Sequence, residues 1–65
     1  MTYKIGDSVK IQTPGEKDET GTVITVIPGN GYEVKMDSSY HSIWFNDDGT
    51  EYRPRYGSTV TGKNE

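Results

Sequence analysis

GTVITVIPGNGYEVKMD, residues 21–37, is the stretch of sequence that decides the fold. Residues 22–27 are a run rich in β-branched side chains, which are enriched in strands. Residues 28–31, Pro-Gly-Asn-Gly, supply the positive φ angles that a tight reversal requires. Residues 32–37 then alternate apolar and charged side chains, as expected for a strand with one buried face. We therefore predict a β-hairpin.

The sequence before this hairpin predicts one more strand and a loop. Residues 3–12 alternate apolar and polar side chains, with Gly6 and Asp7 breaking the run. We predict a bent strand there, with its apolar face in the core. Residues 13–20, TPGEKDET, combine turn-forming residues with a cluster of charges and contain no apolar side chain. They are expected to form an exposed loop.

The sequence after the hairpin predicts a second, aromatic hairpin. Its strands are expected at residues 40–45 and 50–55, joined by the turn Asn-Asp-Asp-Gly at residues 46–49. Pro54 should lie at an edge or end the second strand, because it cannot donate a backbone hydrogen bond. The small, polar residues 57–65 are expected to form either a short closing strand or a flexible tail.

Two registers are open for the aromatic hairpin. If the turn at residues 46–49 ends in a glycine bulge, Ile43 and Phe45 share a face with Glu51. A four-residue loop without the bulge shifts the register by one residue and pairs Ile43 and Phe45 with Tyr52 instead. In either register one face closes the core and the other still carries large side chains.

The composition favours an all-β fold. The 65 residues include no Leu, Ala or Cys, and Leu and Ala are the best helix formers. The five Tyr, one Trp and one Phe, with a net charge of only −3, favour a folded chain over a disordered one. A chain of this length makes one small domain. We predict a single, partly open five-stranded barrel over residues 1–56, with residues 57–65 as the closing strand or tail.

The chain resembles the SH3-like small barrels, and among them the KOW and Tudor-like modules, over about residues 3–37. The resemblance rests on Ile5-Gly6-Asp7-x-Val9-x-Ile11, a polar loop, Gly21-x-Val23-x-x-Val26, a turn, and Tyr32-x-Val34-x-Met36-Asp37. It implies an SH3-like barrel that binds peptides, modified side chains, nucleic acid or partner subunits. Several small phage and photosynthetic accessory proteins look similar, so it also implies an accessory or regulatory role, including a phage-type one.

The absence of cysteine excludes a disulfide scaffold and thiolate metal sites. It is compatible with a reducing cytoplasm, where we expect the protein. No leader-like segment opens the chain, and no apolar run approaches the length of a membrane span. We therefore expect a soluble protein without a membrane partner, either a monomer or a weak homodimer paired through edge strands.

No residue pattern predicts catalysis. His41 lies beside Ser39 and Ser42, but residues one or two apart on a strand do not place a hydroxyl against an imidazole as a catalytic dyad requires. Asp47 and Asp48 are neighbours in a turn, and their role in the turn explains them. A zinc site would have to use carboxylates, which is rare for structural zinc. We predict a protein that is not an enzyme and has no metal or cofactor.

The aromatic hairpin is the candidate binding surface. Trp, Tyr and Arg are the residues enriched in protein-binding hot spots. The same rings could instead fill a core that lacks leucine, and Trp44 is open to both interpretations. The acidic loop at residues 16–19 corresponds to a loop that flanks the ligand groove in SH3-like barrels. We predict a small non-enzymatic protein-binding module, and its partner-binding residues are Tyr40, Trp44, Tyr52, Arg53, Arg55 and Tyr56.

Two alternatives involve nucleic acid. A KOW-like nucleic-acid-binding module would use Arg53, Arg55, Lys10 and Lys35, although a net charge of −3 and a pI near 5.0 oppose phosphate binding. The second alternative is an acidic inhibitor that occupies the nucleic-acid site of another protein. Ten acidic residues offset by seven basic ones make a poor imitation of a polyanion.

Overall fold

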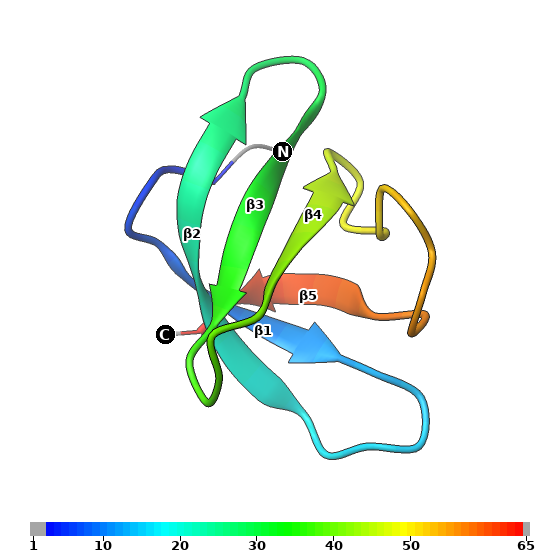
Figure 1. Cartoon of the computed structure of the whole chain (residues 1–65). Helices are drawn as coiled ribbons and strands as arrows, with labels where there is room; N and C mark the ends of the chain where they lie inside the picture. Colours follow the sequence, from blue (N-terminus) through cyan, green and yellow to red (C-terminus); the bar gives the residue numbers. More distant parts are fainter. Residues whose placement is uncertain (1–2, 65) are drawn as a thin grey trace.

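The computed structural model describes residues 3–64 as one curled antiparallel sheet. Its order is β4-β3-β2-β1-β5, and the sheet forms a half-barrel (Figure 1). This confirms the predicted all-β fold and the small, partly open five-stranded barrel. Residues 1, 2 and 65, at the outer ends of the predicted segments, lie outside the described residues. The strands are β1 (Ser8–Gln12), β2 (Glu19–Ile27), β3 (Gly31–Met36), β4 (Ser42–Asn46) and β5 (Thr59–Lys63).

The central hairpin is confirmed as β2 and β3. Ile27 pairs with Gly31 across the turn, and the Asn30 amide donates to the Ile27 carbonyl at 3.0 Å. However, β2 is longer than predicted and begins inside the expected loop. Thr20 pairs with β1, and its hydroxyl donates to Asp37 at 2.8 Å. These partners extend the strand through residues whose side chains are polar.

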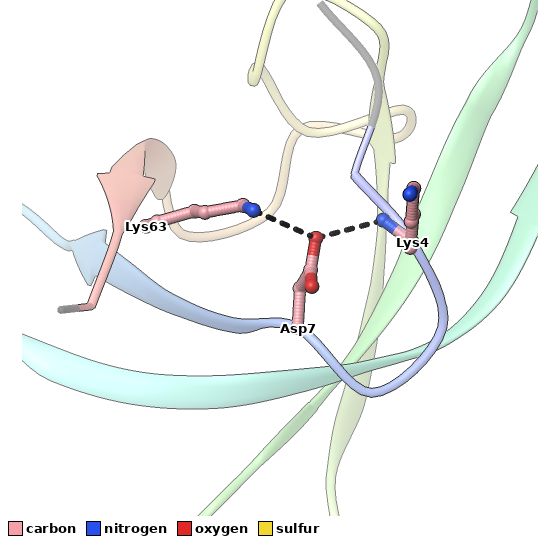
Figure 2. Close-up of polar contacts among 3 residues, drawn as sticks. All are labelled: Lys4, Asp7 and Lys63. Atoms are coloured by element: carbon pink, nitrogen blue, oxygen red, sulfur yellow. Dashed lines mark hydrogen bonds and ion pairs between the residues drawn. The ribbon is translucent and has the colours of Figure 1, made fainter.

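The bend at Gly6 and Asp7 interrupts the first predicted strand, so that β1 covers only its second half. The Asp7 amide donates to the Lys4 carbonyl at 3.0 Å, and Gly6 has a φ of +96°. The Asp7 carboxylate accepts the Lys4 amide at 2.9 Å and lies 3.7 Å from the Lys63 ammonium in β5 (Figure 2). Asp7 therefore joins the start of the described chain to its last strand.

Aromatic and β-branched side chains fill the core, as the absence of leucine requires. The Tyr32 ring lies 5.2 Å from the Tyr3 ring in an edge-to-face arrangement and 5.9 Å from the Phe45 ring in a stacked one. Burial, with smaller contributions from Tyr3 and Asp47, raises the pKa of the Tyr32 phenol, so it stays neutral. The buried apolar residues are Val9, Ile11, Val23, Tyr32, Val34, Met36 and Phe45.

The prediction of a strand at residues 50–55 is wrong, and the full aromatic hairpin does not form. Only Thr50 and Glu51 make strand-like bridges, Glu51 to Phe45 in β4 and Thr50 to Thr59 in β5. Because β4 and β5 are the two edges of the sheet, this short piece of chain links them on the open side of the barrel. The chain then leaves β4 and loops toward β5 (Figure 1).

The turn after β4 takes the glycine-bulge register, one of the two that the sequence allowed. The Gly49 amide donates to the Asn46 carbonyl at 2.9 Å, and Gly49 has a φ of +91°. A Cβ at this position would also lie 2.8 Å from the Val60 carbonyl oxygen. Only glycine fits both constraints easily. Phe45 consequently pairs with Glu51 rather than with Tyr52.

The end of the chain contributes to the sheet. β5 pairs with β1, from Gln12 opposite Thr59 to Val9 opposite Lys63. Residues 59–63 of the predicted closing segment are therefore a strand. No helix in residues 3–64 has the length and apolar character needed to cross a membrane.

Candidate binding groove

A buried carboxylate organises the loop after the Glu51 bridge. Glu51 is only 5% exposed, and its oxygens accept three backbone amides, from Arg55 at 2.6 Å, Tyr56 at 3.2 Å and Ser58 at 3.0 Å. Burial alone would raise the pKa of this carboxyl, but the amides of Arg55, Ser58 and Tyr56 outweigh it and lower the pKa below its ordinary value. Glu51 is therefore ionised at neutral pH and ties together the backbone of Arg55, Tyr56 and Ser58.

The 52–58 loop is also joined to the loop between β1 and β2. The hydroxyls of Thr13 and Ser58 lie 2.7 Å apart, within hydrogen-bond distance. Ser58 is buried, and a Cβ on Gly57 would lie in ordinary contact with the Pro14 ring. Two loops that are far apart in sequence thus form adjoining walls on the open side of the barrel.

The large side chains of the 52–58 loop face solvent. Tyr52 is 63% exposed and Tyr56 is 53% exposed, and Arg53 and Arg55 are exposed as well. The Arg55 guanidinium lies 6.0 Å from the Tyr56 ring centroid. In the part of the chain that the structure describes, the single salt bridge joins Lys63 and Asp7, so neither arginine is ion-paired.

Trp44 belongs to the outer face of β4 and not to the core. It lies opposite Glu33 of β3, while its neighbours Ile43 and Phe45 lie opposite the core residues of β3. The ring is 39% exposed. The Trp44 carbonyl accepts the Tyr52 amide at 2.8 Å, which is the last backbone bond between β4 and the returning chain. Of the two interpretations of Trp44, the structure favours the surface one.

An open groove of about 990 Å³ runs between β4 and the two adjoining loops. Apolar Met36, Ile43 and Phe45 line it beside β4, and Glu16 and Glu19 line it from the segment between β1 and β2. Of the six predicted partner-binding residues, five line this groove, namely Trp44, Tyr52, Arg53, Arg55 and Tyr56.

The structure does not bring the other predicted residues to the groove. Tyr40 is 99% exposed in the turn between β3 and β4, with the Lys35 ammonium 5.8 Å from its ring centroid. It is not among the residues that line the groove, and neither are Lys10 and Lys35. The four cations of the nucleic-acid alternative are therefore not gathered in the groove.

The sequence missed the most important structural residue of the groove, Glu51. A glutamate in an alternating segment resembles an exposed strand residue. No local pattern in the sequence indicates that its oxygens accept hydrogen bonds from backbone amides of residues 55–58. His41, Met36 and Ile43 also line the groove without having been predicted as site residues. The sequence did indicate Glu16 and Glu19 as groove residues, because the loop at residues 16–19 was expected to flank a ligand groove.

The residues considered for catalysis have structural partners. The His41 backbone amide, rather than its imidazole, donates to the Ser39 hydroxyl at 3.3 Å. The Asp48 carboxylate accepts the hydroxyl and the amide of Thr50, and these bonds lower its pKa. Within residues 3–64, no three His, Asp or Glu side chains are grouped so that they could hold a metal ion. The groove can offer aromatic faces, guanidinium groups and carboxylates to a ligand.

No protein-family model, no curated protein and no solved structure matches the chain. The half-barrel is compatible with a small SH3-like fold.

Proposed function

We propose that this protein is a non-enzymatic protein-binding module that docks a partner protein in the groove between β4 and the 52–58 loop. One observation carries the proposal. Two exposed tyrosines, and two arginines that have no ion pair within residues 3–64, are held on a loop whose backbone is tied to the buried Glu51 carboxylate. Exposed rings lose little entropy on binding when the backbone beneath them is already ordered.

The composition of the groove supports a protein partner. Trp, Tyr and Arg are the residues most enriched in binding hot spots, and Trp44, Tyr56 and Arg55 all line this groove. Ile43, which is partly buried, adds apolar surface to the same groove. A partner side chain could be desolvated there while charged groups remain at the rim, which is the usual anatomy of an interface.

Nucleic acid is the weaker candidate. Phosphate binding scales with the number of phosphates that Lys and Arg neutralise. Lys10 and Lys35 lie away from Arg53 and Arg55, and Glu16 and Glu19 line the same groove as the two arginines. An acidic inhibitor of a nucleic-acid-binding protein would present an acidic surface, but here the two exposed tyrosines of the groove, Tyr52 and Tyr56, lie on the same loop as both arginines.

Affinity capture with matched variants tests the proposal. The double substitution of Tyr52 and Tyr56 by Ser should abolish capture of a specific partner. Tyr40→Ser removes an even more exposed tyrosine that lies outside the groove, and it should leave capture unchanged. Circular dichroism should show that both variants stay folded.

Two results would contradict the proposal. One is that no partner binds the wild-type chain above background under any condition tested. The other is that purified partner binds the groove variant and the Tyr40→Ser variant with the same affinity as the wild type.

A further inference from the structure

The outer edge of β4 is only partly covered by the chain itself. In an antiparallel pair, successive residues direct their backbone groups alternately to the two sides. The Met36 amide bonds to the His41 carbonyl, so Ile43 and Phe45 also face β3. Ser42 and Trp44 must then direct their backbone groups outward, and the bond from the Tyr52 amide to the Trp44 carbonyl agrees with this.

The returning chain stops pairing at Tyr52 for two reasons. Pro54 has no amide to donate to β4. In addition, the Glu51 carboxylate takes the amides of Arg55, Tyr56 and Ser58, which draws the loop away from β4. The amide and carbonyl of Ser42 and the amide of Trp44 are left facing the groove, where no strand of the described residues lies.

Two arginines of the 52–58 loop line the same groove as the free edge. Arg53 and Arg55 are the only arginines of a chain with net charge −3, and both line the groove without an ion pair in residues 3–64. Glu16 and Glu19 line the groove as well. A bound segment therefore meets cations from one loop and carboxylates from the other.

We propose that the groove binds an extended acidic segment of the partner protein, which adds to the edge of β4 as a further strand. This rests on the proposed protein-binding function and names the chemistry of the partner. The segment bonds to the free groups of Ser42 and Trp44, and a carboxylate of the segment reaches Arg53 or Arg55. Arginine suits this task, because its planar guanidinium can bind both oxygens of a carboxylate.

Because side chains alternate between the two faces of a strand, the groove can recognise the two faces of the bound segment separately. Side chains that point to one side of the added strand meet Ile43 of β4, and those that point to the other meet Trp44. Backbone bonds supply affinity for any extended segment, whereas the arginines select an acidic one. Glu16 and Glu19 repel a continuous polyanion, so a segment with isolated acidic side chains fits better than nucleic acid.

Selection from a random peptide library displayed on a neutral scaffold tests this proposal. The folded full chain is the bait, and the strongest binders are then synthesised. We expect alternating sequences enriched in Asp and Glu, whose binding changes the fluorescence of Trp44, the single tryptophan. On binding, the amides of Ser42 and Trp44 should become protected from hydrogen exchange.

Matched changes separate the two parts of the proposal. Arg53→Glu and Arg55→Glu should each weaken binding of the selected peptide by about tenfold or more, because a carboxylate loses its partner and meets a like charge. Lys10→Glu makes the same charge change away from the groove and should have no effect. Methyl groups can be placed on either of the two alternating sets of backbone nitrogens in the peptide. The peptide whose methyl groups face β4 keeps its side chains but loses strand pairing and should not bind, whereas the peptide whose methyl groups face away should still bind.

Each contrary result has a distinct meaning. Selected peptides that alter Trp44 fluorescence but are neutral or basic, or that bind equally well in both methylated forms, would overturn the acidic strand and leave a protein-binding groove. Binding of oligodeoxythymidine in competition with the peptide would favour nucleic acid. Protection of the Trp44 amide in a concentration-dependent dimer of the free chain would assign the edge to a second copy. Absence of any selected peptide, with no captured partner, would overturn the proposed function too.

Discussion

The two halves of the sheet are held in place by different means. From β1 to β3, alternating apolar side chains meet in a core centred on Val23 and Val34, and tight turns fix the reversals. After Phe45, the chain up to β5 depends on the Gly49 turn and on one buried carboxylate, Glu51. The first half is built by many small apolar contributions, whereas the second depends on a few polar contacts. Substitutions in the first half should therefore lower the stability of the domain by amounts that vary with the apolar side chain removed. Substitutions in the second half should affect mainly the nearby loop.

Truncation of the core side chain that joins both halves should have the largest effect. Phe45 belongs to β4 but is fully buried against Tyr32 of β3. Phe45→Ala should destabilise the domain by about 3–5 kcal/mol, which is most of the stability available to a chain of this size. Urea unfolding followed by Trp44 fluorescence measures this loss. A loss below about 1 kcal/mol would mean that the two halves do not share one core.

Removal of the charge on Glu51 should have an intermediate and local effect. Glu51→Gln keeps the size of the side chain but offers one strong acceptor oxygen in place of two, so the amides of Arg55, Tyr56 and Ser58 cannot all stay bonded. We expect a loss of about 2 kcal/mol and faster amide exchange confined to the 52–58 loop. Protection in β2 and β3 should stay unchanged.

The same variant should change the pH dependence of stability. The folded-state pKa of Glu51 lies below the ordinary pKa of a glutamate side chain, 4.5, so its contribution to stability is fully present above that pH. As pH falls from 4.5 through the lower folded-state pKa, the contribution is lost. The difference in unfolding free energy between wild type and Glu51→Gln should therefore be constant near neutrality and shrink in acid. A constant difference down to pH 3 would contradict this role of the Glu51 carboxylate.

The difference between the halves also explains how far the sequence predicted the structure. The hairpin of β2 and β3 could be predicted because its turn and its alternation are local and agree with each other. The strand at residues 50–55 was predicted on the same grounds, since Thr50 and Tyr52 favour strands. The predicted strand does not continue after Tyr52 because Glu51 binds amides several residues further along the chain. Such a contact produces no alternating pattern in the sequence.

The candidate groove was predictable in part for a related reason. Exposed aromatic residues and arginines could be recognised by composition, and five of the six predicted residues line one groove. Tyr40 has the same composition but lies in the turn before β4, where only the three-dimensional structure separates it from the rest. The fifth strand was hard to assign because Val60 is the only apolar residue of β5.

The smallest effect is expected at Asp7, where the two ends of the described chain meet. Its carboxylate accepts the Lys4 amide and lies 3.7 Å from the Lys63 ammonium, whose side chain is half exposed. Asp7→Asn keeps an acceptor for the amide and removes only the ion pair, so it should cost about 0.5 kcal/mol at low salt and less at high salt. Asp7→Ala also leaves the Lys4 amide without its acceptor and should cost about 1 kcal/mol. Thermal unfolding of both variants at two salt concentrations separates these contributions. If Asp7→Asn were as damaging as Phe45→Ala, the fold would depend on this polar contact as much as on its core, and the contrast between the two halves would fail.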